Sequence, residues 1–181
     1  MGKQRYPINI VSGVPGTGKT STVNACLDAT IPFVALDIDW LLDSANGLIS
    51  IDNNIDIRFA SRTWPAYNAL WLEVMSTHLR NGNIPVLFAP LTPVDISQLP
   101  DWCESINWLY LDCPDEELVR RLQLRKWSTT AIQGVLGDAE RLRVLANTEA
   151  HPTMMDTNKL STADLVKAIS QWVTGNTTCP P

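Results

Sequence analysis

Near its N-terminus the chain reads Gly13-Val14-Pro15-Gly16-Thr17-Gly18-Lys19-Thr20, which fits the pattern G-x-x-x-x-G-K-S/T at every fixed position. Glycine lets a backbone curl around an anion, so that several N–H groups point at phosphate oxygens. Lys19 adds a mobile positive charge, and Thr20 adds a hydroxyl that can bind Mg²⁺. The stretch therefore predicts a loop that binds the polyphosphate of a nucleoside triphosphate, with Mg²⁺ beside it.

The segments on either side of this loop support that prediction. An apolar strand is expected at Tyr6 to Val11, and a helix at Thr20 to Ala29. Strand, loop and helix follow each other in the order that places a phosphate at the positive end of a helix. The residues expected to contact the nucleotide here are Gly13, Val14, Pro15, Gly16, Thr17, Gly18, Lys19, Thr20 and Ser21.

Length and composition predict one α/β domain. The chain has 181 residues, of which 45% are hydrophobic, which is enough for one sheet with its helices and too little for a second full domain. We expect a single domain over 1–175 and a flexible tail at 176–181. The net charge of −5 argues against nucleic acid as a partner, and no apolar run suits a signal segment or a membrane span. The expectation is a cytoplasmic monomer or homodimer whose partner is a small-molecule acceptor.

Predicted strands and helices alternate along the chain. Beyond the first strand, the apolar segments 33–37, 84–88, 107–111 and 153–156 are expected to be strands. A long helix is expected to begin at Pro65 and end at Gly82, and a last one to run from Ser161 to Gly175. This alternation is typical of a parallel sheet with helices on both faces.

Two acids follow the second predicted strand, in Asp37-Ile38-Asp39. Alternation along a strand puts both carboxylates on one side, at the sheet edge where ligands bind in open α/β folds. One acid can hold Mg²⁺ while the other accepts a proton from an attacking hydroxyl. The alternative is a pair of exposed acids before a helix at Trp40, with Asp39 as its cap.

Basic residues gather in two places. Arg121 and Arg125 lie one turn apart on a predicted helix, and a guanidinium can both stack on a ring and bind phosphate oxygens in pairs. The alternative for this cluster is a solvated face paired with nearby glutamates. Arg58 and Arg62 have the same spacing and are candidates for holding an anionic group of an acceptor, unless they are solvated or pair with acids nearby.

Taken together, these motifs resemble the small P-loop kinases. The D-x-D pair resembles the acceptor-site motif of shikimate kinase and gluconate kinase, and Asp39 is placed like the catalytic acid of chloramphenicol phosphotransferase. The segment 114–127 is similar to the start of the lid in adenylate kinase. The segment 155–161 looks like the last strand and turn of the same kinases, beside the adenine, with Asn158 where serine is common.

The resemblance implies a three-layer P-loop NTPase fold with a five-stranded parallel sheet of order 2-3-1-4-5 and a helical lid at about 115–150. It implies ATP and Mg²⁺ as cofactors. It assigns catalysis to Lys19, Asp39 and Arg125, the metal to Thr20 and Asp37, the nucleotide to Arg121, Arg125 and Asn158 as well as the loop, and the acceptor to Asp39, Arg58 and Arg62.

The expected activity is transfer of the γ-phosphate of Mg-ATP to a hydroxyl of a metabolite, nucleoside or antibiotic. Shikimate itself is disfavoured, because Ala89-Pro90 stands where shikimate kinase has glycines. Two alternatives stay open on these residues: a nucleoside monophosphate kinase, and a nucleotide-binding regulatory protein with weak ATPase activity.

Overall fold

The computed structural model describes residues 5–42, 57–96, 98–148 and 153–176, with the side chains of 57–62 left out. Its sheet has five parallel strands in the order β2-β3-β1-β4-β5, which confirms the predicted order. The strands are β1 (Tyr6–Ser12), β2 (Val34–Asp37), β3 (Pro85–Phe88), β4 (Cys103–Asp112) and β5 (Thr153–Asp156).

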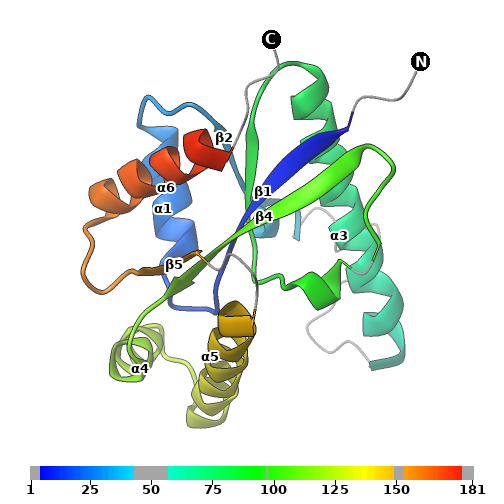
Figure 1. Cartoon of the computed structure of the whole chain (residues 1–181). Coiled ribbons are helices and arrows are strands. Elements are labelled where there is room, and N and C mark those ends of the chain that lie inside the picture. The colour runs from blue at the N-terminus through cyan, green and yellow to red at the C-terminus, as the bar shows by residue number, and fades with distance from the viewer. Residues whose placement is uncertain (1–4, 43–56, 97, 149–152, 177–181) are drawn as a thin grey trace.

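Helices cover both faces of the sheet (Figure 1). On one face lie α1 (Lys19–Leu27) and α6 (Thr162–Asn176), and on the other lies α3 (Ile57–Arg80). Alternate strand residues enter the two cores: Ile8 and Ile10 pack with residues of α3, whereas Val11 packs with residues of α1 and α6. The continuous apolar strands are thus explained by a sheet that is buried on both sides.

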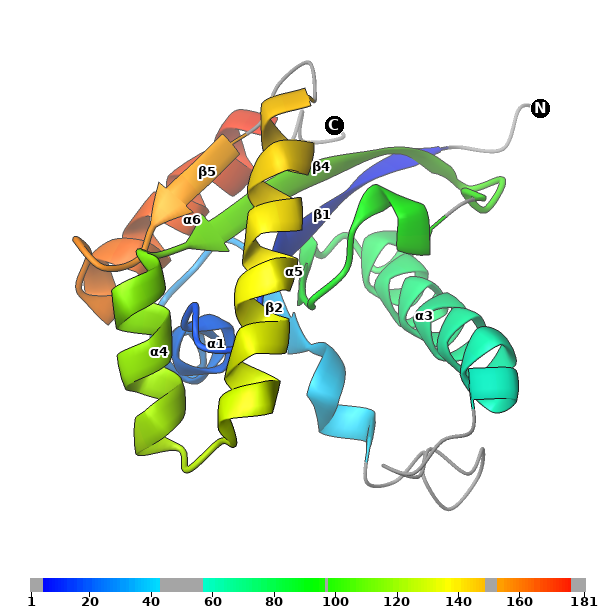
Figure 2. The same cartoon turned by 90° about the horizontal axis from the view of Figure 1, so that it is seen from below.

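Two further helices lie beyond the carboxyl ends of the strands (Figure 2). These are α4 (Asp115–Leu124) and α5 (Thr129–Thr148). Leu118 and Leu122 of α4 form one buried cluster with Ile132 of α5 and with Val14 of the predicted phosphate loop. The region predicted as a lid therefore packs on the loop, and its movement stays a prediction.

One predicted boundary is wrong. The long helix begins at Ile57 and ends at Arg80, so that Pro65 lies inside it rather than at its start. A proline has no N–H to donate to the carbonyl four residues earlier, which is why the sequence favours it in a first turn. Here the helix continues through that position without the bond. The final helix confirms its predicted start, because the Ser161 hydroxyl accepts from the N–H of Asp164 at 3.1 Å and donates to its carboxylate.

The strand register brings three strand ends to one level. Phe88 of β3 lies beside both Val11 of β1 and Asp37 of β2. The chain segments that follow these positions carry the phosphate loop, the paired acids and Pro90, so they meet at one edge of the sheet. Within the described part of the chain, no helix is long and apolar enough to cross a membrane.

Candidate active site

The phosphate loop has the backbone that its glycines predict. Gly16 and Gly18 have φ values of 93° and 99°, which L side chains rarely adopt. At Gly13 the constraint is space, since an added Cβ would lie 2.6 Å from the Thr17 hydroxyl oxygen and 2.7 Å from the carbonyl oxygen of Leu111. Helix α1 begins at Lys19, directly after the loop, so its positive end faces the loop.

The Lys19 ammonium lies within this loop. Its Nζ donates to the carbonyl oxygen of Gly13 at 2.5 Å and to that of Val14 at 3.2 Å. Burial lowers the pKa of Lys19 to about 8, and the charges of Asp39 and Asp37 oppose the shift, whereas the charge of Arg125 reinforces it. Three other predicted site residues, Asp37, Asp39 and Arg125, are therefore within electrostatic reach of Lys19.

Asp37 is the last residue of β2, and the two oxygens of its carboxylate lie in different environments. One oxygen, Oδ1, accepts the backbone N–H of Asp39 at 3.0 Å, which caps the short helix η1 (Ile38–Leu41). The other, Oδ2, is buried and has no hydrogen-bond partner in the described part of the chain. The cap is thus Asp37, where the sequence alternative placed Asp39, because the chain turns immediately after the strand.

Asp39 lies in the first turn of η1 with its side chain exposed. Partial desolvation raises the pKa of this carboxyl, the neighbouring charge of Asp37 raises it further, and Lys19 lowers it in part. A carboxylate whose proton affinity is raised, next to a buried acid and a lysine, suits the role of a general base.

The site residues fit Mg-ATP. The loop is a cradle that a Cβ at Gly13 would fill, and the buried Oδ2 of Asp37 is an acceptor that needs a partner. Thr20 and Asp37 provide hydroxyl and carboxylate oxygens, the ligands that Mg²⁺ prefers, and such sites take few protein ligands and complete the set with water and phosphate oxygens.

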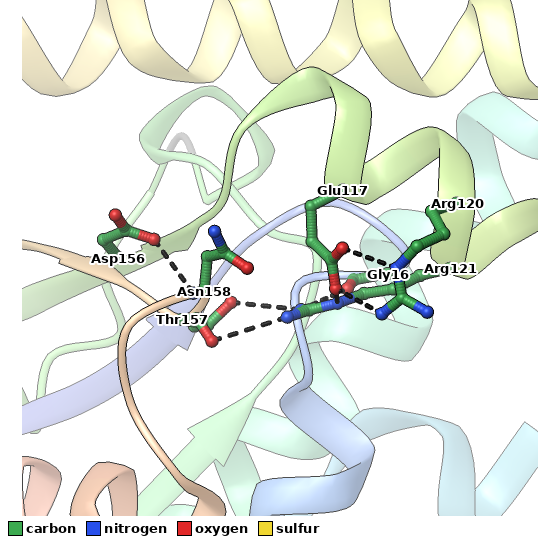
Figure 3. Close-up of polar contacts among 7 residues, drawn as sticks. All are labelled: Gly16, Glu117, Arg120, Arg121, Asp156, Thr157 and Asn158. Carbon is green, nitrogen blue, oxygen red and sulfur yellow. Dashed lines mark hydrogen bonds and ion pairs between the residues drawn. The ribbon is translucent and has the colours of Figure 1, made fainter.

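Arg121 connects three segments that are far apart in the sequence (Figure 3). Its guanidinium donates to the carbonyl oxygen of Gly16 at 3.0 Å, to the Thr157 hydroxyl at 3.2 Å and to Glu117 at 2.7 Å. Most of its donors are thus engaged by protein, so Arg121 fixes α4 and the turn after β5 to the phosphate loop. Its predicted contact with the adenine stays untested.

The other arginines of this region divide into two groups. Arg125, at the end of α4, is exposed and acts on Lys19 through its charge. Arg120 and Arg141 are exposed and pair with acids of their own helices, Glu117 and Asp138 respectively.

Arg143 has a structural role. It donates to both carboxylate oxygens of Asp112, at 2.7 and 3.0 Å, and to Asp115 at 2.7 Å, and these bonds raise its pKa. It therefore fixes α5 to the end of β4, and Asp112 is engaged by this contact.

Three predicted residues remain to be placed. The exposed Asn158 lies in the turn after β5, where its backbone N–H donates to Asp156 at 2.9 Å. Arg58 and Arg62 belong to the first turns of α3, and their side chains lie outside the described residues. Their predicted contact with an acceptor stays a prediction.

Two cavities meet at the phosphate loop. The first, of about 380 Å³, is lined by the second half of the loop with α4, α1 and the turn after β5, and includes Arg121, Arg125 and Leu124. The second, of about 430 Å³, is lined by the first half of the loop with Pro90, by Val94 and Asp95 of η2 (Pro93–Asp95) and by α5. They share no lining residue, so the loop separates two binding spaces.

The ion pair of Arg121 with Glu117, four residues before it, agrees with the sequence alternative in which nearby glutamates pair with the basic cluster. Sequence reasoning missed two other residues of the site. Thr157 and Val94 carry no such signal, because their partners in the site come from distant segments.

The sheet order, the loop and the paired acids together define the fold of the small P-loop kinases. Among solved structures, the chain is similar to a sugar kinase from Janibacter sp. HTCC2649, with a TM-score of 0.63 and 18% identity over 94% of this chain and 95% of the other. It is similar to the tunicamycin resistance protein of Deinococcus radiodurans, with a TM-score of 0.64 and 18% identity over 98% and 100% of the chains.

A gluconokinase from Sinorhizobium meliloti 1021 has a TM-score of 0.55 and 20% identity over 95% of this chain and 94% of the other. No family model and no curated protein matches the chain. At these identities the likeness shows a common fold, and the choice of substrate must be argued from the site.

Proposed function

We propose that this chain is an ATP-dependent phosphotransferase that moves the γ-phosphoryl group of Mg-ATP to a hydroxyl of a small molecule. The observation that carries the proposal is the gathering of Lys19, Asp37 and Asp39 at one edge of the sheet, beside a loop built for phosphate.

The nucleotide would lie along the loop, with Thr20 and Asp37 as the protein ligands of Mg²⁺. When bound, Mg-ATP supplies the phosphoryl group, whose bond to the β–γ bridging oxygen breaks as the acceptor oxygen bonds to phosphorus, and the metal offsets charge. Lys19 and Arg125 each bring a positive charge to the place where negative charge develops.

Asp39 accepts the proton that the acceptor hydroxyl loses. Its exposure allows an acceptor to reach it, and its raised pKa increases its proton affinity. Asp37 is anchored by its bond to the backbone N–H of Asp39, and this bond fixes the Asp37 carboxylate relative to the turn that carries Asp39.

The names of the solved proteins that share this fold support the proposal. They include a sugar kinase, a gluconokinase and a tunicamycin resistance protein, which differ in what they act on. That variety supports a small-molecule kinase in general, and leaves the acceptor to be found by experiment.

The proposal is tested by ADP formation from Mg-ATP across a panel of sugars, sugar acids, nucleosides, nucleoside monophosphates and hydroxyl-bearing antibiotics. We expect one class to stimulate turnover strongly above the basal ATPase rate. Lys19→Ala should abolish that stimulation with the fold intact by circular dichroism, whereas Lys167→Ala, an exposed lysine of α6, should leave it unchanged. Acceptor-independent turnover alone, or full activity of Lys19→Ala, would contradict the proposal.

A further inference from the structure

The 430 Å³ cavity beside the first half of the phosphate loop is placed to receive the acceptor. Gly13 and Val14 line it, and their carbonyl oxygens accept the Lys19 ammonium. Pro90, which also lines it, follows the end of β3, the strand next to the one that leads to Asp39. The cavity thus adjoins the two carbonyl groups that hold the Lys19 ammonium, on the other half of the loop from the cavity beside Arg121.

The walls of this cavity are largely apolar. Val14, Leu142 and Leu145 line it, together with three further apolar residues, namely Pro15, Pro90 and Val94. Val94 is 80% exposed, more than any other large hydrophobic side chain in the described part of the chain. The second most exposed, Leu124 at 71%, lines the cavity beside Arg121. Solvent-exposed apolar side chains in cavities of this size are typical of ligand-binding sites.

The charged side chains that line the cavity disfavour the binding of an anion. Of the described side chains that line it, Asp95 and Asp138 are acidic and Arg141 is basic, and Arg141 already pairs with Asp138. Asp95 is held in place by the N–H and hydroxyl of Thr92, at 2.8 and 2.7 Å on one carboxylate oxygen. A carboxylate or phosphate on the acceptor would meet like charge here, whereas hydroxyl or amino donors would find acceptors.

We propose, on the basis of the phosphotransferase function above, that this cavity binds an acceptor of a particular class: an uncharged or cationic hydroxyl compound with an apolar body. Sugar acids and other anionic acceptors are the class that it rejects, which opposes the sequence expectation that Arg58 and Arg62 hold an anionic group of the acceptor. The apolar body packs on Val94, Pro90 and Leu145, and its polar groups hydrogen-bond to Asp95 and Asp138.

The test separates the apolar body from the negative charge by means of four probes: glucose, glucuronate, phenyl glucoside and phenyl glucuronide. Binding to the ADP-loaded protein is measured by calorimetry, and transfer of phosphate is measured separately. We expect phenyl glucoside to bind at least about tenfold more tightly than glucose, because the ring covers apolar surface. It should also bind more tightly than either anionic probe.

Two matched variants locate the site. Val94→Asp places a charge in the cavity wall and should weaken binding of phenyl glucoside about tenfold or more. Val144→Asp makes the same change at an exposed position of α5 outside the cavity and should leave binding unchanged. Stronger binding of glucuronate, no binding of phenyl glucoside, or equal behaviour of the two variants would overturn the inference.

The two readouts keep this inference apart from the proposed function. Selective binding of phenyl glucoside without transfer of phosphate to any acceptor would refute the phosphotransferase and retain the site. Transfer of phosphate to glucuronate, with no effect of Val94→Asp, would retain the phosphotransferase and refute the site.

Discussion

Asp37 accepts the backbone N–H of Asp39 through one carboxylate oxygen and keeps the other buried without a protein partner among the described residues. The two acids are therefore unlike. Asp37 belongs to the folded backbone of the turn, whereas Asp39 extends into solvent from the turn that Asp37 holds. This difference favours the proposal that the fixed carboxylate binds the metal and that the accessible one accepts the proton.

The assignment predicts separate effects of the two amide substitutions. Asp39→Asn removes the proton acceptor and should lower kcat by about 10²–10⁴ with a hydroxyl acceptor, while the affinity for ATP is retained. Asp37→Asn should instead raise the Mg²⁺ concentration needed for half-maximal rate. Steady-state kinetics at varied acceptor and varied Mg²⁺ measure both.

A nucleoside monophosphate kinase would respond differently, because its attacking phosphate oxygen is already ionised and needs no base. A kcat of Asp39→Asn within a fewfold of the unsubstituted protein would remove the general-base role and favour that activity.

Lys19 predicts a proton uptake linked to nucleotide binding. Its pKa in the folded protein is about 8, whereas the ordinary value is 10.5. Between pH 8 and pH 10.5 the unfolded chain therefore binds more protons at this lysine than the folded protein does. The free energy of unfolding of the ligand-free protein should therefore receive from Lys19 a contribution that increases as the pH rises from 8 toward 10.5. Polyphosphate favours the ammonium form, so binding at about pH 8.5 should take up protons.

Calorimetry in two buffers of different ionisation enthalpy measures this uptake. Lys19→Arg keeps a permanent charge and should bind nucleotide without it. Identical binding enthalpies of the unsubstituted protein in both buffers would show that Lys19 is already charged at that pH.

Arg121 of α4 and Arg125, which follows the end of that helix, should separate binding from catalysis. Arg121→Ala breaks the contacts with Gly16 and Thr157, so it should weaken nucleotide affinity and lower the melting temperature. Arg125→Ala removes an exposed charge that acts on Lys19, and should lower kcat about a hundredfold with nucleotide affinity nearly unchanged. A small effect of Arg125→Ala on kcat would return Arg125 to a solvated face, and unchanged nucleotide affinity of Arg121→Ala would leave Arg121 with a structural role alone.

Steric space in the loop is tested with glycine substitutions. Gly13→Ala forces a Cβ against Thr17 and the backbone of Leu111, and should cost on the order of 1–3 kcal/mol of unfolding free energy as well as nucleotide affinity. The matched control is Gly134→Ala in α5, where an added Cβ meets nothing within 4 Å. That change should stabilise the protein by about 0.5–1 kcal/mol. Denaturant titrations of both variants would reveal any departure.

The parts that local sequence determines were predictable. The loop motif specifies its own backbone through glycine, and the apolar strands with intervening helices specify a parallel sheet. The start of α3 was not predictable from Pro65, because residues before it continue the helix at the loss of one hydrogen bond.

Contacts between residues far apart in the chain could not be predicted from the sequence. Arg121 was expected near the nucleotide, and nothing local indicated that Thr157 would bind it. Arg143 likewise has its partners on a distant strand end. The cavity lined by Val94 exists because η2 and α5 both lie beside the phosphate loop. The sequence pattern does not indicate that these two elements, far apart in the chain, come together.

The central place of β1 also governs how the protein is made. Tyr6 and Ser12 lie beside Cys103 and Tyr110 of β4, so the strand before the phosphate loop is completed by residues near the middle of the chain. During synthesis, the edge of β1 that pairs with β4 therefore stays unpaired until β4 has left the ribosome. Only after that moment is the strand that leads into the phosphate loop paired along both of its edges.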